Sequence, residues 1–174
     1  GELIPEIDLV ISGINHGPNL GEDVYFSGTV AGARSAHIFG VSGIAVSVDS
    51  LGESDYFEDA AEFLIDFIGG FPLFAHERPV LLNINYPDIP VDEIAGIRYT
   101  TLGKREYRDS YNRTGDSKDG FSMMMDGIID SHEIDGSDVT ELRKGFISIT
   151  PLTLDCTDYR YLHIIKHREE QWLK

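Results

Sequence analysis

The chain has 174 residues, 41% of them hydrophobic and 25% charged, which is the length and composition of an ordinary globular domain. Its 14 Lys and Arg residues stand against 30 Asp and Glu residues, so the formal net charge is -16. A chain this acidic repels polyanions at long range, which argues against a DNA or RNA partner. A small phosphate ester is still compatible with this charge, because a few aimed N–H groups or a metal ion can bind it.

The sequence contains a single cysteine, Cys156. No disulfide within the chain and no thiolate metal cluster can form, which favours a reducing compartment. The longest apolar runs, such as 44–48 and 63–68, are far shorter than the roughly 20 residues that span a bilayer, and the first residues show no signal-peptide pattern. We therefore expect a cytoplasmic protein that does not contact a membrane.

The first part of the chain predicts a βαβ unit. Residues 7–12 form an apolar run typical of a strand buried on both faces of a parallel sheet. Residues 13–28 are rich in glycine and lack periodicity, so we expect a loop there. Residues 29–39 predict a helix of small side chains that Gly40 ends, and 44–48 is a β-branched strand.

The second part predicts further alternation and one excursion. Residues 56–68 have the spacing of an amphipathic helix, and 80–84 and 97–102 are expected strands. Residues 103–137 show weak periodicity, which inside a compact domain is typical of a functional or oligomeric excursion. The remaining expected elements are a short helix or turn at 138–144, a strand at 145–150 and a charged terminal helix at 161–173.

The loop and helix start after the first strand form the candidate site. In open parallel sheets ligands bind at the carboxyl ends of strands, and a helix N-terminus presents free N–H groups to phosphate. Asn15 and Asn19 offer neutral oxygen ligands, and Ser27, Gly28 and Thr29 offer hydroxyls and backbone amides. The alternative is purely structural: Asn and Gly are common in turns, and a Ser before a helix is often only its N-cap.

Several motifs give a specific resemblance. Residues 8–33, DLVISGINHGPNLGEDVYFSGTVAGA, resemble the SGIN, G-x-N-L-G-x-D and YSGTVAAA run of the SurE family of stationary-phase survival proteins. The resemblance continues through AVSVD at 45–49, LNINYP at 82–87, residues 96–100 and GFISITPLTLD at 145–155, essentially the whole chain. It implies a three-layer α/β/α, Rossmann-like fold with a mainly parallel sheet, an extended hairpin and a C-terminal exchange segment.

The resemblance also implies an activity. Members of the SurE family are phosphatases that use Mg²⁺ or Mn²⁺ on nucleoside 5'-monophosphates, often on 3'-monophosphates and sometimes on short polyphosphate. Their metal is held by an Asp-Asp pair in an N-terminal N-D-D-G motif, by a Ser, and by the Asn of SGIN, which is Asn15 here. The sequence contains only the last of these, so we expect the catalytic residues outside it and the isolated chain to be inactive. In the whole protein the metal would polarise the phosphoryl group and activate water, while Asn19, Gly28 and Thr29 stabilise the developing charge.

Two alternatives to a phosphatase are compatible with the sequence. The first alternative is a module that binds a nucleotide or phosphate compound without turnover. The second is a Rossmann-type dehydrogenase, which the spacing of Gly13, Gly17 and Gly21 disfavours because it is not G-x-G-x-x-G. The resemblance implies a homodimer or homotetramer, with 103–137 as an oligomerisation excursion. Asn83 and Asn85 are expected to tie neighbouring backbone rather than to touch substrate.

Overall fold

The computed structural model describes residues 6–70, 78–118 and 120–172. Its elements are β1 (Leu9–His16), the 3-10 helix η1 (Gly21–Tyr25), α1 (Gly28–Ile38), β2 (Ser42–Val48), α2 (Phe57–Gly70), β3 (Leu81–Tyr86), η2 (Val91–Glu93), β4 (Gly96–Tyr99), β5 (Arg105–Ser117), β6 (Gly120–Ser131), α3 (Asp138–Arg143), β7 (Phe146–Pro151) and α4 (Tyr159–Trp172). The elements expected from the sequence are all present, with bounds that differ by a few residues.

Among the described residues, five strands form one sheet in the order β1-β2-β3-β7-β4. Strands β1, β2 and β3 run parallel, and β4 runs parallel to β7. Strand β7 is antiparallel to β3, which is the one reversal in the order. The predicted mainly parallel sheet is therefore confirmed, and the carboxyl ends of β1, β2 and β3 meet at one edge.

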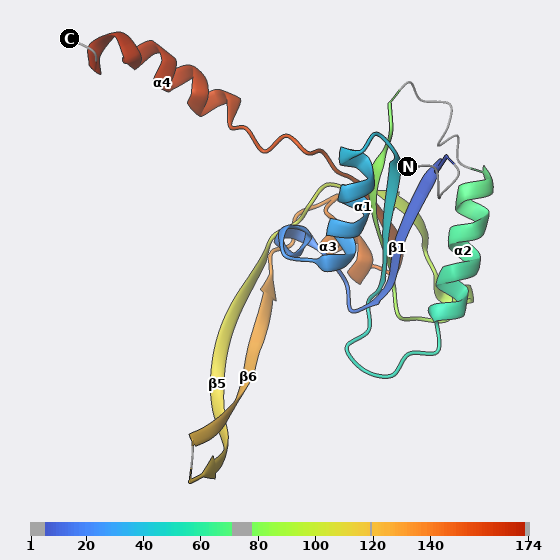
Figure 1. The fold of residues 1–174 in the computed structure, drawn as a ribbon. Coiled ribbons are helices and arrows are strands. Elements are labelled where there is room, and N and C mark those ends of the chain that lie inside the picture. Colours follow the sequence, from blue (N-terminus) through green and yellow to red (C-terminus); the bar gives the residue numbers. More distant parts are fainter. Residues whose placement is uncertain (1–5, 71–77, 119, 173–174) are drawn as a thin grey trace.

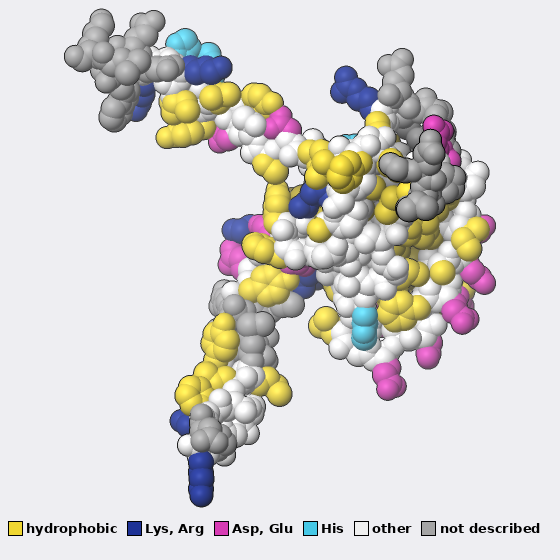
Figure 2. Space-filling view, in the orientation of Figure 1, with side chains coloured by type: hydrophobic (Ala, Val, Ile, Leu, Met, Phe, Trp, Pro, Cys, Tyr) yellow, Lys and Arg dark blue, Asp and Glu magenta, His cyan; other side chains and the backbone are white. Residues whose placement is uncertain are grey.

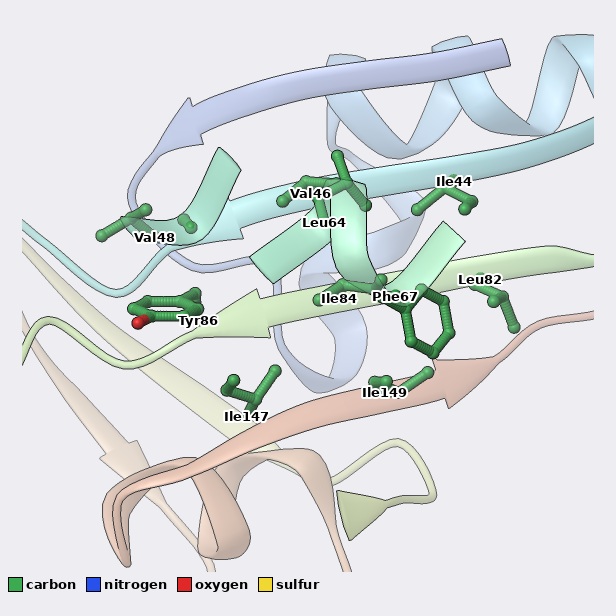
Figure 3. Packing of buried hydrophobic residues seen from close by; sticks show 11 residues of the cluster. Ile44, Val46, Val48, Leu64, Phe67, Leu82, Ile84, Tyr86, Ile147 and Ile149 are labelled. Atoms are coloured by element: carbon green, nitrogen blue, oxygen red, sulfur yellow. The ribbon is translucent and has the colours of Figure 1, made fainter. Parts of the chain in front are cut away.

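The main core lies between the sheet and α2. Helix α2 contributes Ala60, Leu64 and Phe67, which are all buried. They pack on one face of the sheet, where Figure 3 shows the strand residues Ile44, Val46, Val48, Leu82, Ile84, Tyr86, Ile147 and Ile149. Because alternate residues of a strand point to opposite faces, these even-numbered positions of β2 define the α2 side.

Helix α1 covers the opposite face. Its Val30 and Ala33 pack on Ala45 of β2, whose side chain points away from α2. The approach is close, since a Cβ added to Gly43 would lie 2.1 Å from the carbonyl oxygen of Ala33. Helix α1 on one face and α2 on the other give the predicted three-layer α/β/α arrangement (Figure 1).

Strand β1 departs from the prediction in two ways. It continues to His16 instead of ending at residue 12, and η1 interrupts the expected loop. The predicted burial on both faces is wrong, because Ile11 is 45% exposed and the strand alternates between half-buried and exposed residues. The physical reason is its position: among the described residues β1 pairs with β2 alone and forms an edge of the sheet.

Two elements project from the layered body. Strands β5 and β6 form a long antiparallel hairpin within the segment 103–137, and α4 stands apart from the sheet at the end of an extended linker (Figure 1). In Figure 2 hydrophobic side chains are visible on both projections. Within the described part of the chain, no helix is long and apolar enough to cross a membrane.

Ile84 tests the packing between the sheet and α2. Its side chain is fully buried at the centre of the main core, so Ile84→Ala should lower the free energy of unfolding by about 2–5 kcal/mol. Urea denaturation measures this loss. The matched control is Ile65→Ala on the outer side of α2, where Ile65 is 69% exposed, and it should change stability by roughly 0.5 kcal/mol or less. Equal losses in the two variants would contradict the described core.

Candidate functional site

The loop after β1 is held over the carboxyl edge of the sheet by buried asparagines. The backbone N–H of Asn19 donates to Asn85 Oδ1 at 2.8 Å, and its carbonyl accepts from Asn85 Nδ2 at 3.1 Å and from Asn83 Nδ2 at 2.7 Å. Both β3 asparagines are fully buried. The expectation that Asn83 and Asn85 tie neighbouring backbone is thus confirmed, and Asn19 has a fixed place above β3.

The side chain of Asn19 is also held. Its Nδ2 donates to the hydroxyl of Ser47 on β2 at 2.7 Å, and the residue is only 7% exposed. Asn19 therefore has a structural role beside the phosphate-binding role expected from the sequence. The second N–H of its Nδ2 and its side-chain oxygen Oδ1 have no protein partner among the described residues, and these atoms stay available to a ligand.

A buried carboxylate fixes the next part of the loop. Asp138, at the start of α3, accepts hydrogen bonds from the N–H groups of Gly21 at 2.9 Å, Gly103 at 2.7 Å and Val139 at 2.8 Å. Burial raises the pKa of Asp138, although the three N–H donors oppose this shift. The carboxylate joins the loop, the root of the hairpin and α3 at one point.

An ion pair makes a second link between loop and hairpin. Arg105 at the start of β5 pairs with Asp23 of η1, and their side chains are 10% and 14% exposed. The hydroxyl of Tyr107 donates to the same carboxylate, and the Leu20 N–H donates to it at 3.2 Å. Burial and the bond to Asp23 raise the pKa of Tyr107 to about 12, so its phenol stays a donor at neutral pH.

These contacts shape a shallow hollow of 340 Å³ at the edge of the sheet. Its lining residues are Pro18, Asn19, Asp23, Phe26, Ser27 and Tyr107. The structure thus brings together two of the residues expected from the sequence, Asn19 and Ser27. It adds Phe26, which directly precedes Ser27, and Tyr107, which the sequence did not single out because no local pattern shows that the hairpin root returns to this loop.

The start of α1 forms one side of the hollow. Ser27 is the N-cap, and its Oγ accepts from the N–H of Val30 at 3.1 Å. Gly28 and Thr29 are the first residues of the helix, where N–H groups have no intrahelical acceptor. A Cβ added at Gly28 would meet no atom within 4 Å, so the backbone there is open to an incoming group. The N-cap role of Ser27 and an anion-binding role of its neighbours are compatible.

Asn15 lies at the end of β1. Its Nδ2 donates to the carbonyl of Gly17 at 2.7 Å, and its Oδ1 accepts no hydrogen bond from the part of the chain that the structure describes. Within the described ranges no group of three His, Cys, Asp or Glu side chains is arranged to hold a metal ion. One neutral oxygen is a weak ligand for Mg²⁺ or Mn²⁺ without carboxylates, so these residues alone do not fit a divalent cation.

Asp49 is a titratable group that the sequence did not single out. It follows β2 at the carboxyl edge and lines a second cavity of 190 Å³ together with Arg105 and Arg143. Burial raises its pKa to about 6, Asp88 adds to the rise, and the two arginines oppose it. One feature of the sequence could have indicated Asp49: it is an acid placed directly after a buried parallel strand.

The fold and the loop after β1 define a three-layer α/β/α protein with a candidate anion site at the carboxyl edge of its sheet. A family model described as Survival protein SurE matches residues 2–109, and the chain belongs to this family. The resemblance inferred from the motifs is confirmed.

Individual relatives support the same family assignment. The chain is 40% identical over 164 residues to the 5'-nucleotidase SurE of Thermosipho africanus, a match that covers 94% of this chain and 64% of that protein. It is 40% identical over 169 residues to the 5'-nucleotidase SurE of Syntrophomonas wolfei, covering 97% and 61%. The crystal structure of SurE protein from Aquifex aeolicus superposes with a TM-score of 0.70 at 34% identity, over 93% of this chain and 65% of that one. The chain therefore spans less than two thirds of the length of these relatives.

Asp49 gives stability a specific pH dependence. Its folded-state pKa of about 6 exceeds the ordinary value of 3.8, so the folded protein binds the proton more tightly than the unfolded chain does. The contribution of Asp49 to stability is therefore present below about pH 4 and is lost as the pH rises to about 6, by on the order of 2 kcal/mol. Asp49→Asn should remove this loss, as measured by urea denaturation at about pH 4 and about pH 7.

The control for this measurement is Asp66→Asn on the exposed side of α2, which makes the same change of charge. It should leave the difference in unfolding free energy between the two pH values as in the unsubstituted protein. If Asp49→Asn behaves in the same way as Asp66→Asn, burial of Asp49 does not control its ionisation.

Proposed function

We propose that the chain forms the phosphate-binding part of a divalent-metal-dependent phosphomonoesterase that hydrolyses nucleoside 5'-monophosphates. The observation that carries the proposal is that Asn19 and Ser27 line one hollow beside the free N–H groups at the start of α1. The relatives described as 5'-nucleotidase SurE support the reaction class. Nucleoside 3'-monophosphates and short polyphosphate belong to the same proposal as further substrates.

The role of each residue follows from its position. The N–H groups of Gly28 and Thr29 would bind phosphoryl oxygens, aided by the partial positive charge at the start of the helix. Asn19 is fixed by the β3 asparagines, so its remaining amide N–H needs little reorganisation to stabilise charge that develops during transfer. Ser27 holds the helix start as its N-cap, and as a lining residue of the hollow it would lie beside the same oxygens.

Asn15 would contribute one neutral ligand to Mg²⁺ or Mn²⁺. The fixed Nδ2 of Asn15 supports this role, because it leaves Oδ1 as the coordinating atom. The carboxylate ligands would come from outside the described residues, and we expect the isolated chain to be inactive. The proposed location is the cytoplasm, which suits the single exposed Cys156.

The second candidate function is a module that binds a nucleotide or phosphate compound without turnover. The observation that favours it is the same donor set, which within the described residues provides anion-binding groups but no acidic metal cluster. Release of inorganic phosphate separates the two candidates, since only the enzyme produces it.

Phosphate release from AMP and GMP, with and without Mn²⁺, tests the proposal on this chain and on the full-length protein. We expect release in the full-length protein with Mn²⁺. Asn15→Ala should lower this metal-dependent turnover by roughly 100-fold, since a lost ligand weakens the metal site. The control is His16→Ala at the neighbouring position. The ring of His16 packs edge-on against Phe57, with 5.7 Å between the ring centres, and has no assigned role in binding.

The outcomes are distinct. Full metal-dependent turnover after Asn15→Ala would contradict the assignment of this ligand. Binding of AMP without phosphate release in the full-length protein would favour the module without turnover. Phosphate release by the isolated chain would show that its own residues form a complete site.

We also propose that the protein assembles as a homodimer or homotetramer through its two projections. The hairpin exposes Phe121, Met123 and Met124, and α4 exposes Ile164 and Ile165 at 44% each. Contiguous apolar side chains on projecting elements mark surfaces that a protein partner covers. Segment 103–137 would then act as the oligomerisation excursion expected from the sequence.

Light scattering after size exclusion measures the assembly. The unsubstituted protein should give the mass of a dimer or tetramer, and the pair of changes Ile164→Asp and Ile165→Asp should reduce it. Lys166→Asp on the same exposed helix is the control, because it removes no apolar surface. A monomer for the unsubstituted protein would rule out this assembly.

A further inference from the structure

An exposed aromatic ring stands at the edge of the hollow. Phe26 is 90% exposed although its backbone is well fixed, because its N–H donates to the carbonyl of Asp23 at 3.0 Å and the next residue is the N-cap of α1. The exposure alone is not unusual, since Phe39 is 83% exposed; what distinguishes Phe26 is that it lines the hollow. A fixed but open ring beside the start of α1 is a surface on which a planar group can stack.

A second ring lines the same hollow from the hairpin. Tyr107 is half exposed, its hydroxyl donates to Asp23, and the Arg105 guanidinium carbon lies 5.5 Å from the centre of its ring. These two contacts fix the orientation of the ring before any ligand arrives. Pro18 adds a third flat apolar surface to the lining.

We propose that Phe26 and Tyr107 form a stacking site for the nucleobase of the substrate, an inference that rests on the proposed function. The volume of 340 Å³ is within the range of about 300–1,000 Å³ usual for small-molecule sites. The lining combines polar residues, among them Asn19 and Ser27, with the aromatic rings of Phe26 and Tyr107. A nucleotide likewise combines a phosphate with a flat, uncharged base.

Stacking predicts a particular specificity. Every base has a π-face, so the site tolerates different bases. Purine nucleotides should bind more tightly than pyrimidine nucleotides, because their rings cover more of the aromatic surface. Phosphate esters that lack a base should gain nothing from Phe26 or Tyr107. The two rings therefore contribute to substrate selection and not to phosphate transfer.

The test compares Phe26→Ala with Phe39→Ala in the full-length protein. Phe39, at the other end of α1, is 83% exposed and does not line the hollow. Phe26→Ala should raise KM for AMP roughly 10-fold, the scale of one lost base–aromatic stack, and should leave the kinetics of ribose 5-phosphate unchanged. Phe39→Ala should leave both substrates unchanged.

Tyr107 provides an independent variant on the second ring. Tyr107→Phe keeps the ring but removes the hydrogen bond to Asp23 that helps to fix its orientation, so KM for AMP should rise less than in Tyr107→Ala. Tyr107→Ala removes the stacking surface and should raise KM for AMP with little effect on ribose 5-phosphate. Equal changes for the two substrates in Phe26→Ala, or no change for AMP, would overturn the inference.

Direct binding separates this inference from the proposed function. Saturation-transfer NMR with AMP detects contact between the adenine protons and the protein without any turnover. A signal that Phe26→Ala removes and Phe39→Ala keeps supports the stacking site even if no phosphate is released, in which case the proposed function alone fails. No adenine signal with the unsubstituted protein overturns the stacking site even if AMP is hydrolysed.

Discussion

The backbone of Asn19 is held by two buried asparagines of β3, and the position of the candidate site depends on these bonds. An irregular loop can lie over the edge of a sheet only if its polar backbone groups find partners there. Asn85 supplies one donor and one acceptor, and Asn83 supplies a second donor. Leaving one such buried group without a partner costs about 1–3 kcal/mol, so the three bonds hold the loop at this place.

The same loop fixes the hairpin. Asp138 accepts hydrogen bonds from the N–H groups of Gly21 in the loop and of Gly103 at the hairpin root. Arg105, two residues after Gly103, pairs with Asp23 of the loop. A movement of the hairpin root would therefore displace the loop, because both are bonded to the same carboxylates. This shared anchoring explains how a strand distant in sequence contributes Tyr107 to the hollow.

The sequence predicted the elements of the fold well because their signals are local. The β-branched run of β2 and the apolar spacing of α2 are patterns within single segments. The antiparallel placement of β7 beside β3 is not such a pattern, since it depends on which edge of the sheet is free. The exposure of β1 was missed for the same reason: an apolar run does not show whether its strand lies at the centre or at the edge of the sheet.

The candidate site was predictable only in part. The GPNLG motif predicted Asn19, which lines the hollow, because a strand end followed by a glycine-rich loop is a local signal; Asn15 of the SGIN motif does not line the hollow and stays a prediction. Phe26 is adjacent to the predicted turn, yet nothing in the sequence shows that its ring stays in solvent. The hydrogen bond from Asn19 to Ser47 and the approach of Tyr107 are long-range contacts, which a single sequence does not specify.

The electrostatics of the loop reconcile a chain of net charge -16 with the proposed anion site. Remote charges are screened over about 8–10 Å at physiological ionic strength, so the groups close to the hollow decide its potential. Glu22 accepts from the N–H of Arg105 at 2.9 Å, and Asp23 pairs with the guanidinium of the same residue. Asp138 is surrounded by three N–H donors. The nearby carboxylates are thus matched by donors, and the free N–H groups at the start of α1 can attract a phosphate although the protein as a whole repels it.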